Sequence, residues 1–140
     1  MLLFITICCN KNNKIKKDVD YNSDSLTTYL SLAQNKNLPT DKRIQYNKKA
    51  FSILDNRNND SEYRSNLFSV VQQFFVLKDE KSLKKALQLI LDKSIEKKDS
   101  LHIAKTFSIL GNQYINERQN DSAYYYLLKS EKLFLKLKDS

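Results

Sequence analysis

Apolar residues recur every three or four positions along most of the chain, from about residue 23 to residue 138. This spacing places them on one face of an α-helix, whereas a half-buried strand would alternate apolar and polar residues. Short polar stretches interrupt the pattern. It therefore predicts six helices, over residues 23–35, 40–55, 61–78, 80–97, 100–117 and 120–138.

The polar interruptions contain residues that end and start helices. Pro39 favours extended geometry for the residue before it and leaves Thr40 or Asp41 available as an N-cap. The later interruptions place Asp or Ser where the next helix should begin, in the stretches NNDS, LKDEKS, KKDS and RQNDS.

Turn-forming residues are scarce, because the 140 residues include one Gly and one Pro. Sheet proteins need many tight turns, for which glycine is the usual residue. The composition therefore predicts an all-α fold, and the length suits a single domain, which we place at residues 23–140.

The helix breaks also repeat. NDS at 59–61, KDS at 98–100 and KDS at 138–140 recur at spacings of 39 and 40 residues, and each interval holds two predicted helices. Self-similarity of this period is typical of stacked helical hairpins, in which neighbouring hairpins complete one another's core. The predicted hairpins are 23–55, 61–97 and 100–138.

The last hairpin has a distinctive series of aromatic and small residues: Phe107, Leu110, Gly111, Tyr114, Ala123, Leu127 and Ser130. These residues resemble the signature of the tetratricopeptide repeat family, although Leu135 stands where that family usually has Pro. Residues 61–97 match this signature less fully than the last hairpin does, and residues 23–55 match it least. The resemblance implies a right-handed α-solenoid of about three hairpins.

Gly111 lies inside a predicted helix, where Gly costs about 1 kcal/mol relative to Ala. We predict that the helix carrying Ala123 crosses closely there and leaves no room for a side chain. In the adjacent run Tyr124, Tyr125 and Tyr126, not all three rings can face inward, so we predict that Tyr124 or Tyr125 is exposed.

The resemblance also implies a concave groove lined by the first helix of each hairpin. Its strongest predicted positions are Asn66, Ser69, Gln73, Lys105, Ser108, Asn112 and Asn116. Most of these residues are neutral and polar, which suits the backbone of an extended peptide and suits plain solvent equally well. Members of the family that clamp a terminal carboxylate have a lysine at the position of Ser108, which argues against that ligand.

The first nine residues, MLLFITICC, are uncharged and too few to span a bilayer, which needs roughly 20. Thr6-Ile7-Cys8-Cys9 resembles a bacterial lipoprotein processing box, with Thr6 departing from the usual Leu or Val, and Cys9 fits the lipidated position better than Cys8. Residues 1–9 are thus predicted to be a leader and residues 10–22 a polar tether. The alternative is a buried apolar start with two reduced thiols.

The net charge of +8 raises the question of nucleic acid. Four of the basic residues lie in the tether and most others alternate with Asp and Glu on helix faces, which is typical of a solvated surface. His102 is the only histidine, so no cluster for metal, cofactor or acid–base chemistry is evident. We interpret it as a surface or interhelix residue and expect no enzymatic activity, metal or cofactor.

Together these features favour a non-catalytic, protein- or peptide-binding repeat scaffold, anchored in the cell envelope through Cys9. The combination resembles the N-terminal sensory part of bacterial signalling regulators, so we also expect the chain to be part of a longer protein. The alternative is a cytoplasmic basic helical protein that binds nucleic acid.

Overall fold

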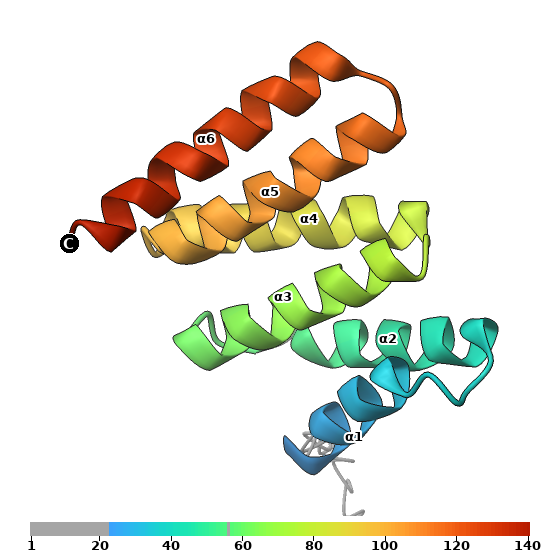
Figure 1. Ribbon diagram of the computed structural model, residues 1–140. Helices are drawn as coiled ribbons and strands as arrows, with labels where there is room; N and C mark the ends of the chain where they lie inside the picture. Colours follow the sequence, from blue (N-terminus) through green and yellow to red (C-terminus); the bar gives the residue numbers. More distant parts are fainter. Residues whose placement is uncertain (1–22, 56) are drawn as a thin grey trace, which may run out of the picture.

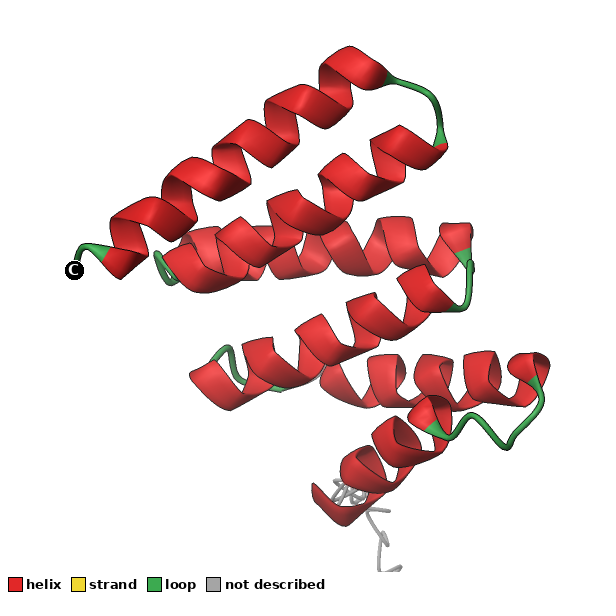
Figure 2. Ribbon diagram, in the orientation of Figure 1, coloured by secondary structure: helices red, strands yellow, loops and turns green. Residues whose placement is uncertain are grey.

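A computed structural model describes residues 23–55 and 57–140, and this part of the chain is entirely helical. Figure 2 shows helices joined by short loops, with no strand in the part described. The all-α prediction is confirmed. The helices are α1 (Ser23–Gln34), α2 (Thr40–Leu54), α3 (Ser61–Val76), α4 (Glu80–Glu96), α5 (Ser100–Asn116) and α6 (Asn120–Lys138).

Three of the helices begin at the acidic caps that the sequence predicts. The side chains of Asp60, Asp79 and Asp99 accept hydrogen bonds from the backbone N–H groups of Tyr63, Ser82 and His102, respectively. Each cap satisfies one of the N–H groups left unpaired in a first helical turn.

The predicted cap of α2 was wrong. Pro39 is the N-cap residue, and its carbonyl accepts a hydrogen bond from Arg43 N at 3.1 Å. Neither Thr40 nor Asp41 caps the helix, because both already lie inside it.

The connections after α3, α4 and α5 share one backbone geometry. Lys78, Lys98 and Arg118 have positive φ angles of 58°, 53° and 59°. In each case the following N–H donates to the carbonyl five residues back, as Asp99 N does to Ser94 O at 2.8 Å. This is a Schellman motif, which normally has glycine at the left-handed position.

The helices run back and forth and step along one direction, so that α1 and α6 lie at opposite ends of the molecule (Figure 1). Consecutive helices pack against each other, and the odd-numbered helices also contact one another, α1 with α3 and α3 with α5. An arrangement of this kind is compatible with an α-helical repeat fold.

The centre of the hydrophobic core lies around α3. Leu67, Val70, Val71 and Phe74 are fully buried there, and Phe74 meets Phe51 of α2 edge to face with ring centroids 6.0 Å apart. From α4, Ala86 and Ile90 are also fully buried. Apolar residues of α2, α3 and α4 therefore share one continuous core.

The close crossing predicted at Gly111 is confirmed. A Cβ atom on Gly111 would lie 2.6 Å from Leu127 Cγ and 3.3 Å from the backbone oxygen of Ala123. Ser130 adds a polar link between the same helices, because its buried hydroxyl donates to Ala104 O at 2.7 Å. The remaining residues of the series, Phe107, Leu110, Tyr114 and Leu127, are half-buried.

The solvent exposure of the three consecutive tyrosines agrees with the prediction. Tyr124 and Tyr125 are both exposed on α6, whereas Tyr126 is half-buried and stacks on Tyr114 of α5 with ring centroids 5.5 Å apart. Tyr126 also contacts Phe107, at 5.6 Å.

Candidate functional site

Two of the odd-numbered helices, α3 and α5, form a surface hollow of about 470 Å³, which we call the α3–α5 hollow. Polar residues from both helices line it, together with three apolar side chains, one of them from α6. The lining residues are Ser65, Phe68, Ser69, Gln72, His102, Lys105, Ser108, Ile109 and Phe134.

A cluster of three charged or titratable side chains lies beside this hollow. Asp99, the N-cap of α5, accepts on Oδ2 from Arg64 Nε of α3 at 2.6 Å and from His102 Nδ1 at 2.8 Å. Its other oxygen, Oδ1, accepts from His102 N at 3.1 Å. Because Arg64 and His102 are both more than nine-tenths buried, this carboxylate joins α3 to α5 within the protein interior.

The environment of Asp99 favours its ionised form. Burial alone would raise the pKa of Asp99, but the hydrogen bonds from Arg64 and from the backbone and ring of His102 outweigh it. The result is a pKa lowered from 3.8 to about 2.

Arg64 extends the cluster to the loop before α3. Its Nη1 donates to Asn59 Oδ1 at 3.0 Å and to Asn59 O at 3.2 Å. Asn59 in turn donates to Lys93 O near the end of α4, at 2.9 Å. The cluster is thus fixed to three helices, α3, α4 and α5.

Lys105 lies one turn after His102 on α5 and contributes a cation to the hollow. Its Nζ lies 5.4 Å from the ring centroid of Phe68, a cation–π distance. No carboxylate of the described residues lies within ion-pair distance of Lys105.

Three of the groove positions predicted from the sequence, Ser69, Lys105 and Ser108, lie together in the α3–α5 hollow. The other four do not line it. Asn66 and Gln73 are half-buried on α3, while Asn112 and Asn116 are exposed on the second half of α5. Asn112 donates to Ser108 O within its own helix, at 2.9 Å.

Sequence reasoning missed most of the other lining residues. His102 is an interhelix residue, one of the two interpretations offered for it, but its link to Arg64 was not foreseen. The only sequence signal for the cluster is the Asp-Ser-Leu-His start of α5, in which a capping Asp precedes His by three residues.

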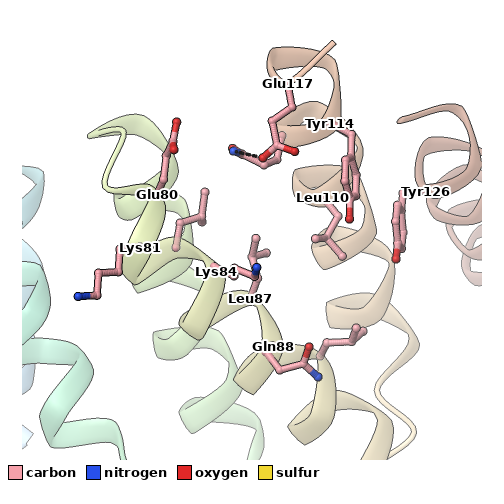
Figure 3. A pocket seen from close by; sticks show the side chains of 12 residues that line it. Glu80, Lys81, Lys84, Leu87, Gln88, Leu110, Tyr114, Glu117 and Tyr126 are labelled. Atoms are coloured by element: carbon pink, nitrogen blue, oxygen red, sulfur yellow. Dashed lines mark hydrogen bonds between the residues drawn. The ribbon is translucent and has the colours of Figure 1, made fainter. Parts of the chain in front are cut away.

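A second and larger hollow, of about 610 Å³, lies between α4 and α5, and we call it the α4–α5 hollow (Figure 3). Leu83, Leu87, Leu91 and Leu110 line it, and the stacked rings of Tyr114 and Tyr126 form one wall. Around it lie Glu80, Lys81, Lys84, Gln88, Gln113 and Glu117. No predicted groove residue contributes to it, because it opens on another face of α5.

The two hollows differ in chemistry. Both cations and anions surround the α4–α5 hollow, whereas the α3–α5 hollow has one lysine, one histidine and hydroxyl groups but no carboxylate in its lining. Neither hollow brings together a nucleophile, a base and oxyanion donors. Within residues 23–55 and 57–140, no group of three His, Cys, Asp or Glu side chains is placed to hold a metal.

None of the six helices described combines the length and the apolar composition that crossing a membrane would require. Cys9, the predicted lipid attachment residue, and the leader and tether that contain it lie outside the described residues.

The chain was compared with protein-family models, curated proteins and solved structures. The chain matches no family model, no curated protein and no solved structure.

Proposed function

We propose that residues 23–140 form a tetratricopeptide-like, right-handed solenoid of three hairpins that serves as a non-catalytic scaffold for a protein or peptide ligand. The observation that supports this proposal best is the contact of α1 with α3 and of α3 with α5. In stacked hairpins, a continuous row of first helices provides an extended binding surface. The α3–α5 hollow lies on that row.

A peptide array tests the scaffold function. Purified protein is applied to immobilised 12-residue peptides of varied composition, and bound sequences are then titrated into ¹⁵N-labelled protein. We expect chemical-shift changes on one face of α3 and α5. Peptide binding confined to α4 or α6, or the absence of binding to every peptide, would contradict the proposal.

The same scaffold is proposed to be anchored in the cell envelope through a lipid on Cys9, as part of a bacterial signalling regulator. The support is the processing box at residues 6–9 and the polar stretch that follows it. Metabolic labelling with a fatty-acid analogue should label the protein, and Cys9→Ser should abolish the label and release the protein from membranes, whereas Cys8→Ser should retain both. Unchanged membrane association of Cys9→Ser would refute the anchor without affecting the scaffold function.

Nucleic-acid binding is the alternative, and the net charge of +8 is the observation that favours it. Filter binding at low and moderate salt separates the two functions. Retention that falls steeply as salt rises would support nucleic-acid binding, because phosphate contacts release counterions. No retention at low salt would exclude it.

A further inference from the structure

We propose that the α3–α5 hollow binds an acidic side chain of a peptide ligand, with the carboxylate beside Lys105 and an adjoining apolar side chain against Phe68 and Phe134. This inference rests on the proposed scaffold function and specifies the chemistry of its ligand. Four observations carry it: the charge of the lining, the state of the buried cluster, the free hydroxyl groups and the apolar walls.

The lining is cationic. Lys105 contributes its charge, and no Asp or Glu does. The α4–α5 hollow differs in this respect, because Glu80 and Glu117 contribute to its lining. An anionic ligand would therefore supply the counter-charge that Lys105 lacks.

The buried cluster cannot supply that counter-charge itself. Both oxygens of Asp99 already accept hydrogen bonds, Oδ2 from Arg64 and His102 and Oδ1 from the His102 backbone. The cluster instead holds the His102 ring in place, with Nδ1 bonded to Asp99. The other ring nitrogen, Nε2, makes no hydrogen bond with the described residues.

Hydroxyl groups complete the donor set. Ser69 donates to Ser65 O, at 3.1 Å, whereas the hydroxyl groups of Ser65 and Ser108 make no hydrogen bond with a described residue. A carboxylate has two oxygens that accept hydrogen bonds from an ammonium and from neighbouring hydroxyl groups.

The apolar walls favour a peptide over a nucleic acid. Phe68 and Phe134 flank the polar groups, and Phe134 is 40% exposed on α6. A single lysine is too few cations for a phosphate backbone, whose binding depends on several charge contacts. An acidic residue next to an aliphatic or aromatic one matches both parts of the hollow.

The test is a ¹⁵N-NMR titration of the full chain at fixed pH with a blocked pentapeptide of alternating leucine and glutamate. Matched probes are the same peptide with glutamine in place of glutamate, that glutamine peptide with a free C-terminal carboxylate, and an oligothymidylate. We expect shifts in residues 65–72 and 102–109 with the glutamate peptide, and about tenfold weaker binding of the blocked glutamine peptide. Lys105→Gln should lose about tenfold in affinity, Lys105→Arg should retain it, and Lys132→Gln, the same charge change on an exposed part of α6, should have no effect.

Equal binding of the two blocked peptides, or an unaltered affinity of Lys105→Gln, would overturn the inference and leave the scaffold function standing. Preference for the free C-terminus over the glutamate side chains would show that the carboxylate comes from a chain end and would also overturn it. Binding of the oligothymidylate alone would contradict both the inference and the scaffold function. No shift with any peptide, even at about 5 mM, would likewise contradict both.

Discussion

At the residue scale, Gly111 and Asp99 have the clearest structural roles, and both join two helices. Gly111 allows α6 to approach α5 closely, since a Cβ atom would overlap Leu127. Asp99 caps α5 and also accepts a hydrogen bond from α3. Substitution at either residue should therefore affect packing between helices as well as the helix that contains it.

Gly111→Ala should lower the free energy of unfolding by up to about 2 kcal/mol. Overpacking typically costs about 1–3 kcal/mol, and the better helix propensity of Ala recovers about 1 kcal/mol of that. Chemical denaturation measures the change. Leu127→Ala in the Gly111→Ala background should cost less than Leu127→Ala alone, because the added methyl group fills part of the space, and a stabilising effect of Gly111→Ala would contradict the close crossing.

Acid should lower the free energy of unfolding through protonation of Asp99. Its pKa is about 2 in the folded chain and 3.8 ordinarily, so the unfolded state binds the proton more readily. The stabilisation, about 2 kcal/mol, is complete above about pH 5 and is lost as the pH falls through about 2. The stability difference between the native protein and Asp99→Asn should therefore shrink between pH 5 and pH 2, as measured by denaturation at each pH, whereas Asp121→Asn on the surface of α6 should show little such change. A constant difference for Asp99→Asn would contradict this role.

At the element scale, helix connections with the same Schellman geometry follow α3, α4 and α5. Lys or Arg stands at the left-handed position of each, where a side chain costs roughly 1–2 kcal/mol. These positions explain why one glycine suffices for so many turns: the hydrogen bonds of the motif and the acidic caps after α3 and α4 hold the backbone in place.

Lys98→Gly should raise the free energy of unfolding by about 0.5–1 kcal/mol, because relief of the left-handed strain outweighs the greater entropy of glycine in the unfolded chain. Lys97→Gly is a matched control one residue earlier, where φ is −97° and no strain exists. It should lower stability by about the same amount. Equal effects of the two substitutions in a thermal or chemical denaturation series would contradict the interpretation of Lys98.

The sequence predicts the helices well because each boundary depends on local residues. Asp60, Asp79 and Asp99 cap helices at the predicted breaks, and the Gly111 crossing follows from a glycine within a helical pattern. The α3–α5 hollow was predicted only in part. Its cluster requires Arg64 to meet residues 35 positions later, and neither periodicity nor spacing shows which side chains meet across such a separation. The α4–α5 hollow was not predicted, because the spacing of its leucines is also that of residues buried in an ordinary helical core.

At the scale of the whole molecule, the essential feature is the contact of α5 with α3. It brings Ser69 of one hairpin next to Lys105 and Ser108 of the next, and it allows Asp99 to bond to Arg64. Without that contact α4 would still pack against α5, but the α3–α5 hollow, with its proposed ligand, would not exist.

The most direct measurement of this contact is a nuclear Overhauser experiment on the full chain with labelled aromatic and histidine rings. The rings of Phe68 on α3 and His102 on α5 have centroids 6.0 Å apart, and those of Phe107 and Tyr126, within the last hairpin, have centroids 5.6 Å apart. We expect cross-peaks for both pairs. A cross-peak for Phe107 and Tyr126 with none for Phe68 and His102 would show that α5 pairs with α6 but does not contact α3, and would contradict the structure described above.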